Sequence, residues 1–325
     1  MTALKRLNQI PAPPSPIAPI AGDVLEGLSR TPKMLPPKLL YDAQGSALFE
    51  QITRLPEYYP TRTEAAILTA HAEEICSRLG PDVSVSELGA GTATKTRILL
   101  RSLLQHQPSV DYFPLDVSDA ALQSAKDELE RELTAVNVHP HVGDFEDLTF
   151  IERHPPPRLV LYIGSSIGNL EQGEAISLLR NVARQLSSGD QLLLGVDLVK
   201  DSNILHAAYN DSAGITASFN KNLLVRINRE LGGHFEPDAF SHVSFWNETA
   251  SRMELHLESS CRQSIRIDAL DMTLRFYRGE RIHTENSYKY TVECIEDLLK
   301  CGGFNVEHTW TDSHCWFAVS LGVVI

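Results

Sequence analysis

The chain has 325 residues, of which 42 % are hydrophobic and 22 % are charged, proportions that are ordinary for a soluble globular protein. Its formal net charge is −13, and Lys and Arg are scattered singly along the sequence. An acidic surface repels phosphate backbones, so we expect no nucleic-acid partner. Neither a run of roughly 18 apolar residues nor a secretory leader is present, which excludes a membrane span and favours a cytoplasmic protein.

The five cysteines are odd in number and irregular in spacing, and no C-x-x-C pair occurs. This pattern argues against a disulfide framework and against a zinc site, and predicts reduced, mostly buried thiols. Among the twelve histidines, His139 and His141 share one face of a predicted strand, but no third ligand accompanies them. We therefore predict no metal.

In chain order, residues 10–22 are rich in proline and indicate a flexible or extended leader. Helical spacing follows in Leu48, Phe49 and Ile52 and is broken by prolines. A longer helix is predicted over 63–79, with a glycine directly after it as the cap.

Strands and helices then alternate, which is the pattern of a doubly wound parallel sheet. Ser118 is the predicted cap of the helix that follows the second strand. The fourth strand, RLVLYIG, is a continuous apolar run of the kind that parallel sheets bury on both faces. The predicted strands are 83–88, 110–116, 138–142, 158–164 and 191–197.

After the fifth strand, residues 199–289 contain segments with the two-residue period of antiparallel strands. A helix in YTVECIEDLLKCGGF and the strands NVEHTWT and CWFAVSLGVV complete the chain. We predict an α/β protein with a seven-stranded, Rossmann-like class I methyltransferase sheet and a second α+β domain. The predicted units are a cofactor domain (63–198 and 290–325), a substrate-binding lid (23–62 and 199–289) and a proline-rich leader (1–22).

The phrase ELGAGTATKT, over 87–96, places a glycine turn between a strand and a helix. Thr94 stands where the dinucleotide motif needs its third glycine, and no phosphate-binding G-x-x-x-x-G-K-[ST] motif occurs. Asp116, at the end of the second strand, can accept from both ribose hydroxyls of an adenosine. Asp144 and Phe145, after the third strand, can bind the adenine amino group and stack on the ring.

These groups suit an adenosine without a polyphosphate, and therefore S-adenosylmethionine. The predicted cofactor-binding residues are Glu87, Gly89, Gly91, Thr92, Lys95, Asp116, Gly143, Asp144 and Phe145.

From about Leu35 onward the chain resembles the histidine Nα-methyltransferases of ergothioneine biosynthesis. The resemblance lies in LPPKLLYDAQGSALFEQITRLPEYYPTRTEA, ELGAGTATKTRILL, YIGSSIGNL, GVDLVKD, AYNDSAGITASFNKN and HTENSYKY. It implies trimethylation of the α-amino group of L-histidine to hercynine.

The resemblance also implies roles for individual residues. Asn169 and Tyr209 would hold the α-carboxylate and α-amine, and together with Tyr41 they are the predicted catalytic residues. Glu285 and Ser287 would bind the imidazole, since a carboxylate accepts from its N–H and a hydroxyl serves its other nitrogen. The remaining predicted pocket residues are Phe49, Tyr58, Gly164, Ser166, Thr216 and Leu255.

One position departs from the family, since Leu255 stands where its best-known members have methionine. The exchange is nearly isosteric. The open alternatives are an N-methyltransferase of another amino acid or small amine, a non-catalytic S-adenosylmethionine-binding module and, more remotely, a nicotinamide oxidoreductase. We expect a monomer.

Overall fold

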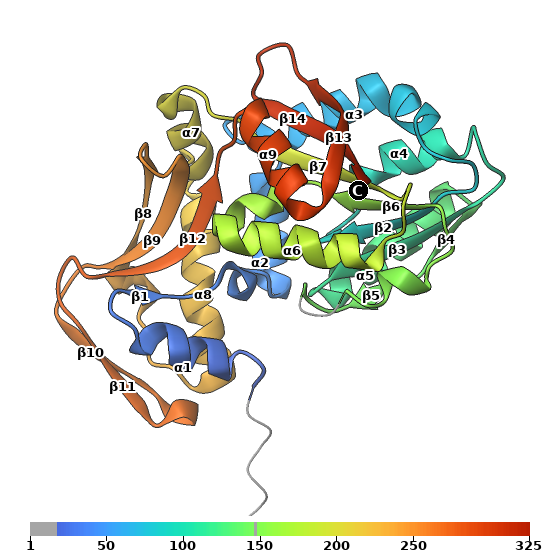
Figure 1. Ribbon diagram of the computed structural model, residues 1–325. Helices are drawn as coiled ribbons and strands as arrows, with labels where there is room; N and C mark the ends of the chain where they lie inside the picture. Colours follow the sequence, from blue (N-terminus) through green and yellow to red (C-terminus); the bar gives the residue numbers. More distant parts are fainter. Residues whose placement is uncertain (1–17, 146–147) are drawn as a thin grey trace, which may run out of the picture.

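The computed structural model describes residues 18–145 and 148–325 of the chain. A large mixed sheet carries helices on both faces, and a smaller sheet lies beside it (Figure 1). In the described part, the large sheet has the order β13-β14-β7-β6-β2-β3-β4, with β5 also pairing with β3. Its strands are β2 (Ser84–Leu88), β3 (Val110–Asp116), β4 (Val136–Val138), β5 (His141–Val142), β6 (Arg158–Tyr162), β7 (Gln191–Asp197), β13 (Phe304–Thr311) and β14 (Phe317–Val324).

Two apolar layers enclose this sheet. Helices α3, α4 and α5 pack on one face, and α6 and α9 pack on the other. All residues of β6 and β7 are buried, as the continuous apolar runs predict. Ser118 caps α5 by accepting from the Ala121 N–H. The helices are α3 (Pro60–Ser77), α4 (Thr96–Leu103), α5 (Asp119–Glu132), α6 (Gln172–Gln185) and α9 (Val292–Gly302).

The predicted fold class is confirmed, with one strand broken in two. The expected third strand at 138–142 is wrong in extent: β4 ends at Val138, and β5 begins at His141. Pro140 lies between them and has no N–H to continue the ladder to β3. Because both pieces pair with β3, they occupy one position, and the sheet has the predicted seven positions.

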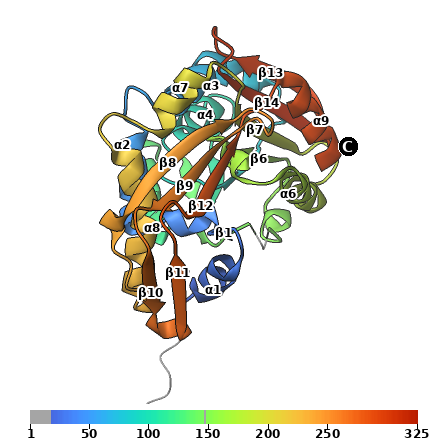
Figure 2. The same cartoon turned by 90° about the vertical axis from the view of Figure 1, so that its left-hand side faces the viewer.

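Within the described ranges, the remaining chain contains a smaller sheet of order β1-β12-β9-β8, the hairpin β10-β11 and four further α-helices (Figure 2). Helix α8 and the N-terminal segments share one apolar core with this sheet. The elements are α1 (Ala21–Ser29), β1 (Lys33–Met34), α2 (Ala43–Ile52), α7 (Ser202–Tyr209), α8 (Ile215–Leu231), β8 (Phe240–Asn247), β9 (Arg252–Ser259), β10 (Gln263–Ile267), β11 (Met272–Phe276) and β12 (Arg281–Tyr288).

Two sequence-based expectations need correction. The predicted leader falls largely outside the described residues, but its last part is not extended, because α1 begins at Ala21 and Ile20 is buried beside it. The cysteines are not mostly buried: Cys76 is, whereas the other four are exposed. Two of those four, Cys294 and Cys301, lie on the outward face of α9, where the apolar stripe of the helix does not reach. No helix within the described ranges is long and apolar enough to cross a membrane.

Candidate active site

The glycine turn after β2 is hydrogen-bonded to the end of β3. Gly89 and Gly91 have φ of +70° and +52°, a backbone region that favours glycine. The Gly91 N–H donates to Asp116 Oδ2 at 2.8 Å, and the Gly89 N–H donates to the Leu115 carbonyl at 2.9 Å. A ligand can approach the backbone here, because no heavy atom lies within 4 Å of where a Gly91 Cβ would stand.

The segment after β5 completes this edge of the sheet. The Gly143 N–H donates to the Asp116 carbonyl at 3.0 Å. The Phe145 ring lies against the glycine turn, with its Cζ 3.7 Å from the position of a Cβ on Gly89, and packs edge-to-face on Tyr162. Asp144 lies between these two residues in sequence. A backbone cradle, a carboxylate and an aromatic ring therefore meet at the carboxyl ends of β2, β3 and β5, where doubly wound sheets bind ligands.

Glu87 has a different environment from the one its predicted cofactor role suggests. Its buried carboxyl accepts from Thr96 Oγ1 at 2.6 Å and from the Tyr112 hydroxyl, which ties β2 to α4 and β3. Burial raises the pKa of Glu87 to about 7. Thr92 Oγ1 contacts Glu50 of α2 at 3.1 Å, so the glycine turn touches the N-terminal segment of the second sheet.

Lys95 forms an ion pair with Glu64 of α3, a fully buried residue absent from the sequence prediction. The same carboxylate accepts from the Gly164 N–H at 2.9 Å. Glu64 therefore holds the lysine of the glycine turn beside the end of β6. A sequence signal for it exists: Glu64 shares the stripe of Ile67 and Leu68 on α3, where a charged residue needs a buried partner.

Seven of the predicted pocket residues line one cavity between the smaller sheet and helices α2, α7 and α8, whereas Gly164, Ser166, Asn169 and Ser287 do not line it. Its empty space is about 300 Å³, part of it open to solvent. Aromatic rings form much of the wall, and neighbouring rings meet edge-to-face, as Tyr41 and Phe49 do at 5.6 Å between centroids. The lining residues are Tyr41, Phe49, Ile52, Tyr58, Ala208, Tyr209, Thr216, Phe219, Leu255 and Glu285.

A bulge in β12 brings Glu285 and Ser287 onto the cavity face. Before the bulge, Ile282 of β12 pairs with Leu257 of β9 and shares its face of the sheet. After an irregularity between His283 and Glu285, the odd-numbered residues of β12 lie on that same face. Glu285 then lies opposite Leu255, and the Ser287 Oγ is 2.7 Å from the Tyr209 hydroxyl. Without the extra residue, Glu285 and Ser287 would point to the other side of the sheet.

Asn169 lies next to Glu285, and these two residues and Ser287 form what we call the polar wall. Asn169 belongs to the short 3₁₀ helix η3 (Ser166–Asn169), which follows β6. With its amide nitrogen turned toward β12, Asn169 donates to the Asn286 carbonyl at 3.0 Å and to Glu285 Oε1 at 3.3 Å. Ser166 and the Lys95 ammonium both lie close to Gly164, which has φ of +86°. The end of β6 therefore connects the glycine turn with the cavity.

The electrostatics of the wall centre on Glu285. Burial raises the pKa of its carboxyl to about 7, against the lowering effect of the Lys289 ammonium. At neutral pH this carboxyl is therefore poised between its acid and its carboxylate. It can accept a hydrogen bond from an N–H donor once ionised.

Sequence reasoning missed a buried charged group behind the cavity. Asp197, at the end of β7, pairs with Lys200 at 2.6 Å and with Lys289 at 2.8 Å, and the Tyr59 hydroxyl donates to it. Burial would raise the pKa of Asp197, but the two lysines outweigh burial and lower it. The signals available were an acid ending an apolar strand in GVDLVKD and a lysine between two tyrosines in YKY.

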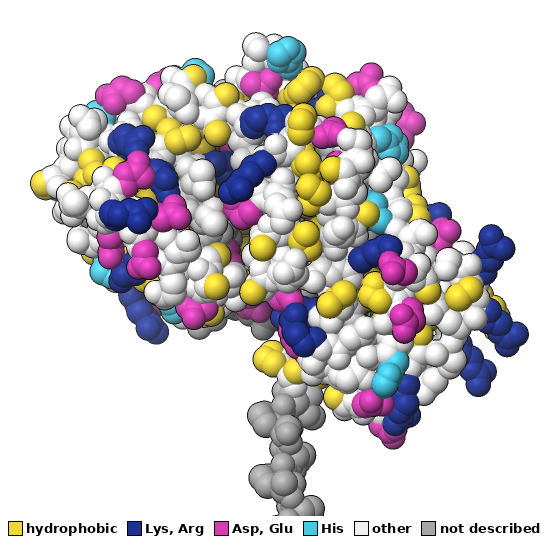
Figure 3. Space-filling model, turned by 180° about the vertical axis from the view of Figure 1, so that it is seen from behind, with side chains coloured by type: hydrophobic (Ala, Val, Ile, Leu, Met, Phe, Trp, Pro, Cys, Tyr) yellow, Lys and Arg dark blue, Asp and Glu magenta, His cyan; other side chains and the backbone are white. Residues whose placement is uncertain are grey.

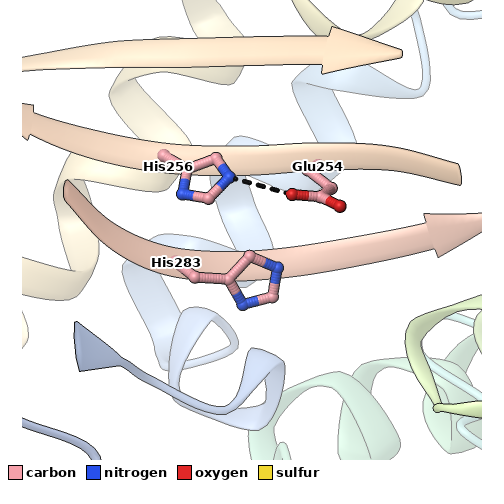
Figure 4. A group of neighbouring side chains, drawn as sticks. All are labelled: Glu254, His256 and His283. Carbon is pink, nitrogen blue, oxygen red and sulfur yellow. Dashed lines mark hydrogen bonds and ion pairs between the residues drawn. The ribbon is translucent and has the colours of Figure 1, made fainter. Parts of the chain in front are cut away.

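A second cluster of side chains lies on the opposite face of β9 and β12. Glu254, His256 and His283 form the one group in the described residues with the donor types and proximity for a metal ion, their donor atoms lying within 4.8 Å of one another (Figure 4). The Glu254 carboxylate already pairs with Arg252 at 2.8 Å. Each ligand of a bound transition metal lies about 2.0–2.2 Å from the ion, so the ligand atoms would have to draw closer together.

Comparison with known proteins gives the family. Residues 20–324 match the family model described as histidine-specific methyltransferase, SAM-dependent. The chain belongs to this family. The predicted methyltransferase class and its cofactor, S-adenosylmethionine, are thereby confirmed, and the match extends to residues before Leu35.

Three relatives illustrate the range of the family. The chain is 44 % identical over 301 residues to the histidine N-alpha-methyltransferase of Mycolicibacterium smegmatis, covering 93 % of this chain and 94 % of that protein. It is 46 % identical to the protein of the same name from Mycobacterium tuberculosis, covering 92 % and 93 %. It is 32 % identical to ergothioneine biosynthesis protein 1 of Neurospora crassa, covering 86 % of this chain but 32 % of that longer protein.

The edge of the large sheet fits the cofactor of this family. The open space at Gly91 accommodates a ligand against the backbone, and Asp116 stands beside it with a carboxylate, an acceptor of the kind that ribose hydroxyls need. Phe145 offers a ring face for an adenine. Lys95 reaches from the same turn toward Gly164, where the cofactor edge meets the cavity.

Proposed function

We propose that this chain transfers three methyl groups from S-adenosylmethionine to the α-amino group of L-histidine and forms hercynine. The observation that carries this proposal is the aromatic cavity with Glu285 on its wall and Ser287 hydrogen-bonded behind Tyr209. A carboxylate and a hydroxyl two residues apart on one face of β12 suit the two nitrogens of an imidazole. The names of the mycobacterial relatives support the same substrate.

Bound S-adenosylmethionine supplies an electrophilic methyl group on a sulfonium sulfur. The chain's part is to hold a neutral amine in line with that methyl group, and we assign this orientation to Asn169 and Tyr209. The faces of Tyr41, Phe49 and Tyr58 can stabilise the quaternary ammonium product through cation–π attraction. The cation–π contacts require no N–H on the amine, so they persist as methyl groups replace its protons.

The wider arrangement follows from this assignment. We propose that 23–62 and 199–289 act as the substrate-binding lid over the cofactor unit, and that the protein works as a monomer in the cytoplasm. The cavity is lined by residues of the lid, among them Tyr58 and Glu285, and Asn169 of the cofactor unit reaches it through its hydrogen bond to Glu285. Histidine binding would therefore align the lid with the cofactor unit.

The test is mass spectrometry of the purified protein with S-adenosylmethionine and each of the twenty amino acids. We expect histidine to gain one, two and then three methyl groups. Glu285→Gln should lower kcat/KM for histidine by at least about 100-fold, because a buried charged acceptor is lost, while calorimetric binding of S-adenosylmethionine is retained. Glu258→Gln, on β9 and paired with Arg281 at the surface, is the matched control and should change little.

The alternatives give different results. Methylation of another amino acid, or full histidine turnover in Glu285→Gln, would overturn the imidazole assignment. Cofactor binding without turnover of any amine would indicate a non-catalytic module. Binding of NAD in place of S-adenosylmethionine would indicate an oxidoreductase.

A further inference from the structure

Lys289 is a fully buried lysine immediately behind the histidine cavity. Its ammonium contacts three oxygen atoms: Asp197 Oδ2 at 2.8 Å, the Tyr209 hydroxyl at 2.8 Å and Ser287 Oγ at 2.7 Å. An ammonium has three protons and accepts nothing. All three of its protons are therefore committed, two of them to residues of the proposed substrate site.

This arrangement limits what the two hydroxyl groups can donate. Tyr209 and Ser287 each accept from Lys289, so neither can direct its own proton toward that nitrogen. Their oxygens are 2.7 Å apart, which means that one hydroxyl donates to the other. Of the two hydroxyl protons, one therefore remains uncommitted to Lys289 or to the other hydroxyl.

We propose that Lys289 is a positioning residue of the histidine site: by donating to Tyr209 and Ser287 together, it turns their single remaining O–H toward the substrate. The site then selects a ligand that presents a hydrogen-bond acceptor at this point and a donor to Glu285. A neutral imidazole has one of each. The inference deepens the proposed function and rests on it.

The charges around Asp197 make this role separable from folding. Two ammonium groups and one carboxylate are buried together, so the group carries a net positive charge. Removing either lysine leaves a neutral pair with the other, whereas removing Asp197 would leave two unpaired cations. Lys200 contacts Asp197, the Tyr59 hydroxyl and a backbone carbonyl, and is not bonded to Tyr209 or Ser287. It is the matched control.

The charge of Lys289 also acts on Glu285. The titratable and charged groups that face this carboxyl are Lys289 and the hydroxyls of Tyr41, Tyr58 and Tyr209. Among them only Lys289 carries a positive charge, and it lowers the pKa of Glu285. Loss of that charge should therefore raise the pH at which histidine binding sets in.

The experiment compares Lys289→Met and Lys200→Met with the wild-type enzyme over a range of pH. In Lys289→Met we expect KM for histidine to rise by roughly tenfold to 100-fold, with a smaller change in kcat and unchanged calorimetric binding of S-adenosylhomocysteine. The acid limb of kcat/KM should move to higher pH. Lys200→Met should keep the wild-type KM and pH profile.

Further variants keep the result decisive. If Lys289→Met does not bind S-adenosylhomocysteine, Lys289→Gln takes its place, because its amide can still donate two hydrogen bonds without a charge. It should show the shifted acid limb with a smaller rise in KM. Combining Lys289→Met with Ser287→Ala should cost less than the product of the two separate losses.

Three results would overturn the proposal: a wild-type KM and pH profile in the folded Lys289 variant, an equal loss in Lys200→Met, or full multiplicativity with Ser287→Ala. Failure of the proposed function is distinguished at the outset, because wild-type enzyme would then leave histidine unmethylated. In that case the assignment of Lys289 to a histidine site falls with it.

Discussion

At the scale of single residues, several ionisable groups are buried, and their pKa values depend on burial and on the neighbouring side chains. Glu285 and Glu87 both have a pKa raised to about 7 by burial, but their surroundings differ. Glu87 is occupied by Thr96 and Tyr112 and holds β2 to its neighbours. Glu285 faces a cavity, so its protonation is free to affect ligand binding. Environment rather than residue type distinguishes these two acids.

The raised pKa of Glu285 predicts a pH dependence. Below pH 7 the carboxyl is protonated and can no longer accept from the imidazole N–H as an anion, so kcat/KM for histidine should fall as the pH drops through about 7. Steady-state rates between about pH 5.5 and about pH 9 measure this fall, because that range extends roughly one to two units on either side of the pKa of Glu285. The free substrate's imidazole titrates near about 6.5 and adds its own limb.

Glu285→Gln separates the two contributions, because it keeps the substrate limb and removes the enzyme limb. A profile that is identical in wild type and Glu285→Gln would show that Glu285 does not titrate in the working enzyme.

At the scale of elements, the site depends on how closely η3 approaches β12. A Cβ on Gly168 would lie 2.9 Å from the Tyr288 carbonyl oxygen and 3.3 Å from its nitrogen, both backbone atoms that cannot move aside like a side chain. The adjacent residue, Asn169, makes the hydrogen bonds to Glu285 and the Asn286 carbonyl. The missing side chain at Gly168 therefore sets the distance between the two halves of the polar wall.

Gly168→Ala should push η3 away from β12. We expect a loss of roughly 1–3 kcal/mol in the free energy of unfolding, as is usual for overpacking, and a rise of about tenfold in KM for histidine from the displaced Asn169. Denaturant titration and steady-state kinetics measure the two effects.

Gly173→Ala is the control, because no heavy atom lies within 4 Å of its Cβ position near the start of α6. It should leave KM unchanged and be neutral or slightly stabilising. Equal kinetics in the two variants would mean that the approach of η3 to β12 does not position Asn169.

At the scale of the whole molecule, the two sheets have separate apolar cores and are joined by polar contacts. The core of α8 and the N-terminal segments is distinct from the two layers of the large sheet. Polar contacts cross the boundary where ligands are expected, as between Thr92 and Glu50 and between Tyr59 and Asp197. Binding energy from both ligands can therefore be used to align the two parts.

The surface predicts a monomer in solution. The face in Figure 3 shows charged side chains of both signs among scattered hydrophobic ones. The exposed large hydrophobic residues in the described ranges lie on different elements and turns: Leu25, Met34, Val117, Val142, Val199, Val225, Tyr277 and Ile325. Stable dimers need a sizeable continuous interface, so light scattering should give the chain mass of 36.1 kDa at micromolar concentration. Twice that mass, independent of salt, would contradict the expectation.

Much of the fold was predictable because it depends on local patterns. Continuous apolar runs correctly predicted β6 and β7, and Ser118 was correctly predicted to cap α5. Pro140 shows where such reasoning stops short, because it interrupts the segment 138–142 that was expected to form one strand. The exposed cysteines show the same limit: whether a thiol on a helix is buried depends on which face another element covers.

By itself the sequence determined the alternation of strands and helices, the glycine turn with Asp116 and Phe145, and the family. These features depend on residue types at short spacing in the sequence, and such local patterns do not depend on how distant segments pack. Only the tertiary structure decided which face of β12 looks into the cavity. A strict two-residue period would send Glu285 away from the face of Ile282, and one extra residue at the bulge reverses that phase. Likewise, only folding brings Lys289, Asp197 and Tyr59 together, because buried charges find their partners across distant segments of chain.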